Sequence, residues 1–522
     1  MDSSALTAPI AGAPLDTLDT LDTLDTLDTL DPLAPQDCYR ALSARDRRFD
    51  GVFFTGVTTT GIYCRPVCAA RTPRASSCEF FASAAAAEAA GFRPCLRCRP
   101  ELAPYALQEN LAYAVWQRIA AGALNEHDGS GHGGSIEQLA QTVGLSSRQL
   151  RRVLLEHFGV TPIELAQTQR LLFAKKLLQE TDLPLAQLAY AAGFGSVRRF
   201  NALFATRYGM APGALRRTAA QNKSPSGDGG ASAIILRLAY RPPFAWDTML
   251  SYLARRALPG VEAVLDGCYL RTVRLNGCVG WVRVTHRPDH HQLQIEIAPT
   301  LAPQLMPLMA RLRSQFDLDA NPTVIAAHLQ HDPLLAAVLA RLPGLRVPGS
   351  FDAFELGLRA VLGQQVSVAG ASTLAARLVT QFGSPVQTPF AVLTRHAPTP
   401  AELAAQPVVA IAALGLPASR AQTILAVAHF AATDGLTLPP GATLAQCVAR
   451  LKSVPGIGEW TAQYIALRAM RFPNAFPAGD LALQKAAAGV DGVRLSEKAL
   501  LARATNWAPW RGYAALLLWH AA

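Results

Sequence analysis

The sequence predicts a multidomain protein that is mainly α-helical and carries small α+β domains. Its 522 residues suggest three or four domains at about 100–200 residues each. Half of the residues are hydrophobic, which is enough for every domain to build its own core. Helical periodicity dominates residues 105–217 and the chain beyond about 350, whereas strand-like alternation is found near 51–64, 234–240 and 292–299.

The beginning of the chain has no pattern typical of a folded domain. Residues 1–36 contain the acidic repeat LDTLDTLDTLDTLD, whose period of three fits neither an amphipathic helix nor a strand, so we predict a disordered low-complexity tail. No apolar run reaches membrane-spanning length and no signal peptide is visible. We therefore expect a cytoplasmic, nucleoid-associated protein without a membrane partner. The formal net charge of +10, carried mostly by Arg, favours a polyanionic partner.

The domain that we place at residues 37–104 holds two close cysteine pairs. Three residues separate Cys64 from Cys68, and two separate Cys95 from Cys98. Four cysteines in two close pairs are an economical set of ligands for one tetrahedral zinc ion, so we predict one zinc as cofactor. On spacing alone, a purely structural zinc site remains an open interpretation.

The stretches TTGIYCRPVCAAR and AAGFRPCLRCRPE resemble the N-terminal zinc domain of the Ada family of methylation sensors. The resemblance covers about residues 38–104. It implies that all four cysteines bind zinc and that Cys64 also accepts a methyl group from a methylphosphotriester in DNA. Zinc keeps bound thiols deprotonated, and the thiolate is the nucleophile that such a transfer needs. Methylation turns one thiolate into a neutral thioether, so we expect it to raise the affinity for DNA phosphates.

Residues 105–217 contain two segments of the same plan, SIEQLAQTVGLSSRQLRRVLLEHFGVTP and PLAQLAYAAGFGSVRRFNALFATRYGMAP. Each predicts a helix, a turn with a glycine (Gly144 or Gly193) and a second helix. The second helices begin at Ser146 or Ser147 and after the cap Ser196. Two such units resemble the AraC-type DNA-binding domain, which implies double-stranded promoter DNA and RNA polymerase as partners.

The second helix of each unit is the expected recognition helix, because its N-terminal residues contact base edges in the major groove. The candidates for DNA contact are Arg148, Gln149 and Arg152 in the first unit and Val197, Arg198 and Arg199 in the second. The same arginines are compatible with a solvated face, because phosphate contacts outnumber base contacts.

A polar stretch rich in Gly and Ser, TAAQNKSPSGDGGASA, predicts a linker over residues 218–232. We expect this linker to leave the two halves of the chain mechanically independent. Beyond it, a strand leads into a helix, and QLQIEIAP alternates as a further strand. From about residue 350, helical stretches separated by Pro and Gly run to the end of the chain.

VPGIG between two helical stretches predicts a helix-hairpin-helix. Gly456 and Gly458 let backbone N–H groups approach a DNA phosphate, and the next helix adds its positive end. Alone, the motif indicates only binding to the DNA backbone. Here Trp460 follows it, and Asp480 lies twenty positions after Trp460.

Together with RPPFAWDTMLSYLARRA, FDAFELGLRAVLGQQVSVAGA and WAPWRGYAALLLWHAA, this motif resembles the AlkA-type 3-methyladenine DNA glycosylases II over residues 235–522. The resemblance implies a small mixed α/β domain at 233–347 and a helix-hairpin-helix glycosylase domain at 348–522. It also implies that Asp480 is the catalytic carboxylate. A carboxylate there stabilises the positive charge that builds on the sugar as the N-glycosidic bond breaks.

The same resemblance implies a pocket for a flipped-out, cationic base, lined by Trp460, Tyr464, Trp519 and Tyr252. Large aromatic residues are also typical of a hydrophobic core, which is the alternative interpretation. Members of this superfamily that also cut the DNA backbone have a lysine at the position of Trp460. Without that amine no Schiff base forms, so we expect a monofunctional glycosylase.

The chain departs from the AlkA pattern at three positions. Gln365 stands where AlkA-type enzymes insert a leucine wedge into the gap left by the flipped base. Gly479 replaces a second aspartate, and Leu481 replaces a tyrosine. A polar amide fills an apolar gap less favourably than leucine does, so the flipping device differs from that of the family.

These predictions describe a fusion of a zinc methylphosphotriester sensor, an AraC-type DNA-binding domain and an AlkA-type glycosylase. We expect it to detect DNA methylation, to activate repair genes and to excise alkylated bases. One alternative is a transcriptional regulator whose glycosylase half only binds DNA. Another is a repair enzyme whose front half is a targeting module without a role in transcription.

Overall fold

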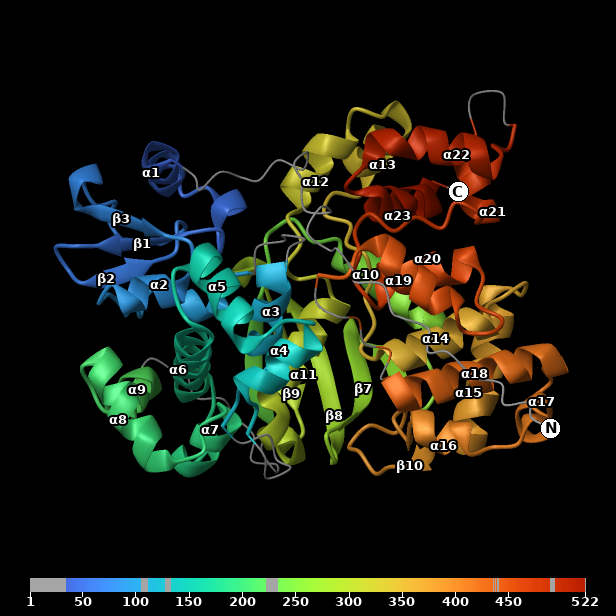
Figure 1. The fold of residues 1–522 in the computed structure, drawn as a ribbon, viewed down its shortest axis with the longest axis horizontal. Coiled ribbons are helices and arrows are strands. Elements are labelled where there is room, and N and C mark those ends of the chain that lie inside the picture. Colours follow the sequence, from blue (N-terminus) through green and yellow to red (C-terminus); the bar gives the residue numbers. More distant parts are fainter. Residues whose placement is uncertain are drawn as a thin grey trace, which may run out of the picture.

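The computed structural model describes residues 34–104, 111–126, 133–221, 233–434, 436, 438, 441–488 and 493–521. Within these residues it confirms a multidomain, mainly helical protein with small sheets (Figure 1). None of the described helices is long and apolar enough to cross a membrane. The predicted tail over 1–33 lies outside the described residues, whereas Pro35 and Gln36 begin helix α1 (Pro35–Ser43) and do not belong to a tail.

The cysteine-rich domain is a small sheet with helices packed against it. Its elements after α1 are β1 (Phe54–Val57), β2 (Ile62–Cys64), β3 (Cys78–Phe81), α2 (Ala84–Ala89) and β4 (Arg93–Pro94). Strands β1 and β2 lie in the stretch with predicted strand-like alternation and form an antiparallel hairpin, and the strand order is β3-β1-β2-β4. Strand β2 ends at Cys64, and Cys95 directly follows β4. The parallel pairing of β2 with β4 therefore brings the two cysteine pairs to one end of the sheet.

The helix-turn-helix region confirms both predicted units. Its helices are α3 (Leu111–Ala120), α4 (Ile136–Thr142), α5 (Ser147–Phe158), α6 (Pro162–Glu180), α7 (Leu185–Ala191), α8 (Val197–Tyr208) and α9 (Pro212–Gln221). Gly144 and Gly193 have φ of 68° and 86° at the turns, a region that favours glycine. The side chains of Ser146 and Ser196 cap α5 and α8. Helix α9 continues to Gln221 into the predicted linker, and the rest of that linker lies outside the described residues.

The next domain is a five-stranded antiparallel sheet with the order β5-β9-β8-β7-β6. Its elements are β5 (Ile234–Ala239), α10 (Trp246–Arg256), β6 (Glu262–Leu265), β7 (Cys268–Leu275), β8 (Cys278–Arg287), β9 (Gln292–Ile297) and α11 (Leu305–Gln315). Figure 1 places this sheet in the middle of the molecule, with the cysteine-rich and helix-turn-helix domains on one side and the C-terminal helices on the other.

The C-terminal part is a helical bundle with one small two-stranded sheet among its described residues. Its elements are α12 (Pro322–Leu329), α13 (Pro333–Arg341), α14 (Ala353–Leu362), α15 (Val368–Phe382), β10 (Ser384–Pro385), β11 (Arg395–His396), α16 (Pro400–Ala404), α17 (Val408–Ala412), α18 (Ala418–Asp434), α19 (Leu444–Lys452), α20 (Glu459–Arg468), α21 (Leu481–Ala486), α22 (Glu497–Ala504) and α23 (Arg511–Ala521). One large hydrophobic core joins these helices, including α12 and α13.

The second helix-turn-helix unit and the five-stranded sheet share a single hydrophobic core. Leu177 of α6 and Phe200 of α8 belong to the same buried cluster as Leu236 of β5. Hydrogen bonds cross the same boundary, because the Arg237 backbone N–H donates to Glu180 Oε2 at 2.9 Å, and Lys176 Nζ donates to the Arg237 carbonyl. The expected mechanical independence of the two halves is therefore wrong. Residues separated by a polar linker in the sequence are packed together in space.

Candidate functional site

The four cysteine sulfur atoms predicted to bind zinc lie within 4.8 Å of one another. Zn–S bonds of about 2.3 Å place tetrahedral sulfurs about 3.8 Å apart, so the cluster fits a single zinc ion. Cys68 and Cys95 are buried, whereas Cys64 and Cys98 are half-buried. Cys64 is thus one of the two ligands that a substrate can approach from solvent, as a methyl acceptor requires.

The electrostatics of the cluster also favour a bound cation. The hydrogen bond with Cys68, and then those with Cys95 and Cys98, raise the pKa of the Cys64 thiol. The hydrogen bond from Cys64 lowers the pKa of Cys95. Sulfurs this close repel one another as thiolates unless a positive charge offsets theirs. A zinc ion supplies that charge and keeps the thiols that bind it deprotonated.

Neighbouring residues hold the cysteine loops in place. The Arg65 backbone N–H donates to Cys98 Sγ at 3.4 Å, and its guanidinium donates to the Cys98 carbonyl at 3.1 Å and to Asp50. Lys175 Nζ of α6 donates to the Cys95 carbonyl at 3.3 Å. The cluster is therefore bound directly to the helix-turn-helix region. Sequence reasoning missed Arg65, although its position beside Cys64 in the motif was a usable signal.

Asp480, the predicted catalytic residue, is the N-cap of α21. Its Oδ1 accepts hydrogen bonds from the backbone N–H groups of Ala482 at 2.9 Å and Leu483 at 3.1 Å. Trp460 Nε1 donates to Oδ2 at 3.0 Å, and Trp519 Nε1 donates to Oδ1 at 3.4 Å. The helix start and the two indoles together fix the orientation of the carboxylate.

The four aromatic residues predicted for the pocket are linked by contacts, and two of them, Trp460 and Trp519, bind this carboxylate. Tyr252 is buried, as the core interpretation expects. The rings of Trp460 and Tyr464 stack at 5.3 Å with an angle of 10° between their planes. Trp519 meets Tyr464 edge-on at 6.4 Å. The hydroxyl oxygens of Tyr464 and Tyr252 are 3.2 Å apart. Trp460, Tyr464 and Trp519 are half-buried and are not purely core residues, which matches a binding surface better than the alternative interpretation.

Two arginine side chains, Arg468 and Arg256, contact the tyrosines of this aromatic cluster and affect their pKa values. Arg468 Nη1 donates to Tyr464 Oη at 2.6 Å, and Arg256 lies 3.8 Å from the centre of the Tyr252 ring. Burial raises the pKa of Tyr464, but Arg468 and then Arg256 outweigh it and bring the pKa to about 8. Burial raises the pKa of Tyr252 to about 12. Sequence reasoning missed Arg468, whose i,i+4 spacing from Tyr464 on α20 was a signal.

Gln365 is exposed on the loop between α14 and α15. Its φ of 56° puts it in the left-handed region. The preceding Gln364 anchors the loop, because its Nε2 donates to the Gly456 carbonyl at 3.2 Å and to Thr461 Oγ1 at 3.1 Å. The loop that carries the predicted wedge is therefore tied to the helix-hairpin-helix, a contact that sequence reasoning did not identify.

The predicted helix-hairpin-helix joins α19 to α20, and its two glycines have different surroundings. Gly456 has φ of 87°, and a Cβ atom there would lie 1.9 Å from Thr423 Oγ1, so only glycine fits. A Cβ at Gly458 would meet no atom within 4 Å. Gly458 is the N-cap of α20, so its surroundings leave room for a phosphate at the positive end of that helix.

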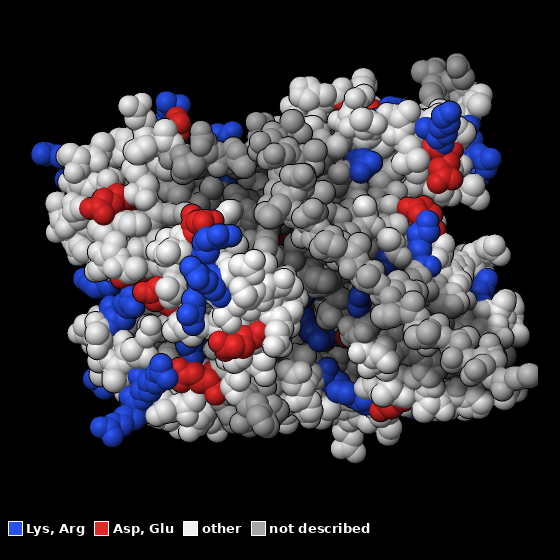
Figure 2. Space-filling model, in the orientation of Figure 1, with Lys and Arg blue, Asp and Glu red and all other residues white. Residues whose placement is uncertain are grey.

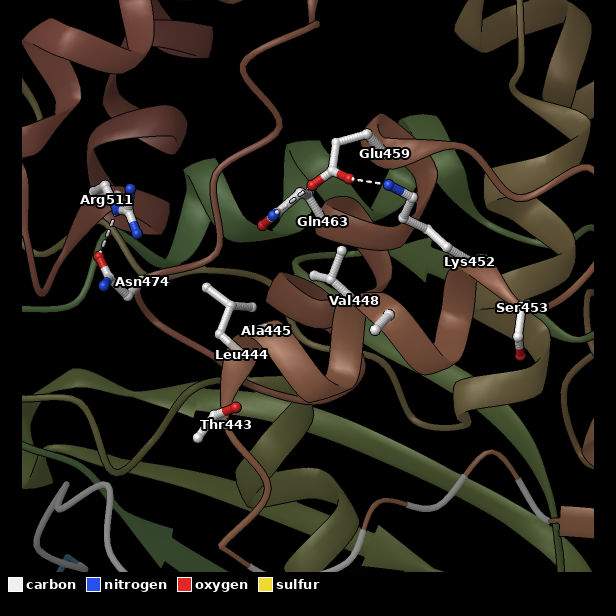
Figure 3. A pocket seen from close by; sticks show the side chains of 11 residues that line it. Thr443, Leu444, Ala445, Val448, Lys452, Ser453, Glu459, Gln463, Asn474 and Arg511 are labelled. Atoms are coloured by element: carbon white, nitrogen blue, oxygen red, sulfur yellow. Dashed lines mark hydrogen bonds and ion pairs between the residues drawn. The ribbon is translucent and has the colours of Figure 1, made fainter. Parts of the chain in front are cut away.

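A different stripe of α20 faces an open cavity of about 910 Å³, which Figure 3 shows. Glu459 accepts hydrogen bonds there from Lys452 at 2.8 Å and from Gln463 at 3.0 Å. Gln463 Oε1 in turn accepts from the Phe476 backbone N–H at 3.0 Å. This bond holds the segment that leads from Phe476 to Asp480 against α20. The residues of α20 that face the cavity therefore help to position the carboxylate.

Five of the six candidate DNA-contacting residues are exposed, namely Arg148, Gln149, Arg152, Arg198 and Arg199, whereas Val197 is half-buried against the core that the second unit shares with the five-stranded sheet. Figure 2 shows Lys and Arg side chains gathered over α5 and α8. Gln149 also completes the helix cap, since its Oε1 accepts from the Ser146 backbone N–H at 2.9 Å. Arg199 forms an ion pair with Glu126 at 3.3 Å. The arginines thus remain candidates, whereas Gln149 has a structural role in addition.

Comparison with known families identifies four regions of the chain. Residues 37–101 match the metal binding domain of Ada, and 139–218 match a helix-turn-helix domain. Residues 235–352 match the AlkA N-terminal domain, and 358–511 match the HhH-GPD superfamily of base excision DNA repair proteins.

Three curated relatives cover different lengths of the chain. A probable bifunctional transcriptional activator/DNA repair enzyme AlkA from Mycobacterium tuberculosis H37Rv is 40% identical over 92% of this chain and 95% of its own length. DNA-3-methyladenine glycosylase 2 of Escherichia coli K12 is 34% identical over 54% of this chain and 96% of its own. The Escherichia coli bifunctional transcriptional activator/DNA repair enzyme Ada is 39% identical over 24% of this chain and 33% of its own.

The cysteine cluster, the two helix-turn-helix units and the carboxylate among aromatics thus occur in one chain, and 92% of that chain aligns with the Mycobacterium tuberculosis relative. The chain belongs to the family of bifunctional AlkA-type transcriptional activator/DNA repair enzymes.

Proposed function

We propose that this chain senses DNA methylation, activates transcription of repair genes and hydrolyses the N-glycosidic bond of alkylated bases of the 3-methyladenine type. We also propose the domain boundaries 37–104, 105–217, 218–232, 233–347 and 348–522, although α9 continues into the fourth residue of the linker and α12 and α13 pack into the C-terminal core. The observation that carries the glycosylase assignment is the Asp480 carboxylate held between two indole N–H groups and a helix N-terminus.

In base excision, the aromatic residues receive the flipped base. The faces of Trp460, Tyr464 and Trp519 attract a cationic, alkylated purine, which departs readily because it already carries a positive charge. As the bond to the sugar lengthens, positive charge builds on the sugar. Asp480 stabilises that charge and orients the water that completes hydrolysis. The alternative of a glycosylase half that only binds DNA leaves this arrangement without a role.

In sensing, Cys64 is the proposed acceptor. Zinc held by Cys64, Cys68, Cys95 and Cys98 keeps the accepting sulfur a thiolate. The sulfur attacks the methyl carbon of a methylphosphotriester. A carbon–sulfur bond forms, the carbon–oxygen bond breaks, and the phosphodiester leaves with the electron pair. The cluster loses one negative charge, which lowers its repulsion from DNA phosphates.

The regulatory role follows from the contact between the cluster and the DNA-binding helices. Lys175 of α6 links the Cys95 loop to the helix-turn-helix region, so tighter binding of DNA by the sensor helps to hold both units on a promoter. Activation of transcription from that promoter implies contact with RNA polymerase. An association with the nucleoid follows from binding to DNA.

The test exposes the purified protein to methylated duplex DNA. Chromatography should detect released 3-methyladenine, and mass spectrometry should find one added methyl group on the peptide that contains Cys64. Cys64→Ser should abolish the methyl transfer, and Cys78→Ser, outside the cluster, should leave it intact. Absence of free base with the wild type would refute the glycosylase assignment. A methyl group on another cysteine would refute the assignment of the acceptor.

A further inference from the structure

A cavity of about 420 Å³ lies between the cysteine-rich domain, the residues that follow the edge strand β5, and the start of α12. The residues that line it are Arg45, Asp46, Arg47, Arg48, Arg241, Pro242, Asn321 and Thr323. None of them belongs to the sites described above. The first four come from the sensor half of the chain, and the other four come from the glycosylase half.

Hydrogen bonds between the two halves hold this cavity in shape. The buried Arg241 donates from Nη2 to the Asp50 carbonyl and from Nη1 to the Asp319 carbonyl, both at 2.6 Å. Asn321 Nδ2 donates to the Arg48 carbonyl at 3.0 Å. Specific hydrogen bonds between the sensor half and the glycosylase half therefore fix the position of the cavity walls.

The charge of the cavity is strongly positive. Its four arginines outnumber its single carboxylate, and that carboxylate, Asp46, is bound by Arg48 Nε at 3.0 and 2.9 Å. Four positive charges less one negative leave a formal surplus of three. Asn321 is also the N-cap of α12, so the positive end of this helix points toward the same place. Burial and then Arg47 lower the pKa of His291, which agrees with a positive potential beside Arg47.

Phosphate is the ligand whose chemistry fits this cavity best. Guanidinium groups present forked N–H donors that match phosphate oxygens, and helix N-termini bind the same group. Crowding several arginines around one space is unfavourable unless an anion offsets their repulsion. The cavity combines both kinds of donor, and its one carboxylate is already paired.

The cavity adjoins the methyl-accepting cluster. Arg45 Nη2 donates to the carbonyl of Ala70, two residues after the ligand Cys68, at 3.2 Å. Asp50, whose carbonyl Arg241 binds, pairs through its carboxylate with Arg65, the residue after Cys64. We propose that this cavity binds a backbone phosphodiester of the DNA whose methylated phosphate is presented to Cys64. This inference rests on the sensing role proposed above.

A phosphate in this position is held by both halves of the protein. The exposed Arg45 and Arg47 bind it from the sensor, while the start of α12 binds it from the glycosylase half and the buried Arg241 contributes its positive charge. DNA bound by the sensor therefore tightens the contact between the two halves. The site adds a DNA contact that the isolated sensor domain lacks.

The test is the salt dependence of DNA binding by the full chain. Arg47→Ser removes one exposed guanidinium and leaves the contacts of the buried Arg241 in place. The slope of log affinity against log salt concentration should become shallower by about 0.9 for one lost phosphate contact. Arg40→Ser is the matched control, because Arg40 is an exposed arginine of the same domain that does not line the cavity. It should leave the slope unchanged.

The outcomes separate this site from the proposed function. Equal slopes for Arg47→Ser and wild type would overturn the proposal. A second result would also overturn the proposal: inorganic phosphate raises the melting temperature of wild type but not of Arg47→Ser, while the salt slopes for DNA binding are equal. The cavity would then bind free phosphate and not the DNA backbone. At saturating DNA, Arg47→Ser should still release 3-methyladenine and accept a methyl group on Cys64. If wild type does neither while the slopes differ as expected, the proposed function fails and the phosphate site stands.

Discussion

Replacing Asp480 by Asn tests the catalytic assignment with little change of shape. The carboxylate receives three donors at Oδ1, from Ala482, Leu483 and Trp519, and one at Oδ2, from Trp460. In Asp480→Asn, the amide oxygen takes the position of Oδ1, where it accepts from the same three donors. The NH2 group then faces the indole N–H of Trp460, so two donors meet where a donor and an acceptor met before.

The magnitude follows from what is lost. The cap of α21 survives, because the amide oxygen still accepts the two backbone N–H groups. One hydrogen bond to a charged group is lost, which is worth about 1.5–3 kcal/mol of folding stability. The negative charge that stabilises the transition state is also lost, and groups with this role are commonly worth about 10²–10³ in rate. We therefore expect base release to fall by at least about 10², with the affinity for lesion-containing DNA retained.

Single-turnover release of 3-methyladenine measures the rate, and urea unfolding measures the stability. Asp332→Asn is a matched control, because Asp332 caps α13 and accepts the indole N–H of Trp507 at 3.0 Å, outside the pocket. It should lower stability by breaking its pairing with Arg503, and it should leave base release nearly intact. Base release by Asp480→Asn within about twofold of wild type, set against the expected loss of 10² or more, would refute the assignment of Asp480.

Three further predictions address other parts of the molecule. Elemental analysis should find about one zinc per chain, reduced by Cys98→Ala but not by Cys78→Ala; zinc unaffected by the first change would contradict the four-cysteine site. Gln365→Leu should excise bases at least as well as wild type, because it restores an apolar wedge; strongly weakened excision would mean that Gln365 reads the opposite base. Lys175→Met should lower the free energy of unfolding by about 1–3 kcal/mol, because it removes a buried ion pair of 2.6 Å with Glu101 while Arg99 still pairs with Glu101 at 3.0 Å; unchanged urea unfolding would show that the Lys175 pair does not hold the sensor to α6.

The sequence by itself determined the features whose signals are local. The cysteine spacing predicted the metal cluster, since each pair lies within one turn of chain. Serine caps and left-handed glycines marked both helix-turn-helix units, because a cap or a positive φ depends on a few neighbouring residues. The hairpin that contains Gly456 and the i,i+4 pair of Trp460 and Tyr464 were predictable for the same reason.

Resemblance to a family, rather than spacing, was needed to bring distant residues to one site. Tyr252 meets Tyr464 across 212 positions of sequence, and Trp519 reaches Asp480 across 39. No periodicity links such residues, because their meeting depends on how helices α10, α20 and α23 pack. Arg468 and Gln364 were not predicted, because each acts through a residue that it contacts in the folded structure. Arg468 contacts Tyr464, and Gln364 contacts Gly456.

Only the tertiary structure decided how the two halves of the chain are joined. The polar linker suggested independent halves, yet α6 and α8 share a core with the five-stranded sheet, and Arg241 closes a basic cavity against the sensor. The composition of a linker reports how the chain between two domains behaves. Whether the domains adhere depends on the fit of their apolar faces and on the pairing of their buried charges, and both are properties of surfaces that form only after each domain has folded.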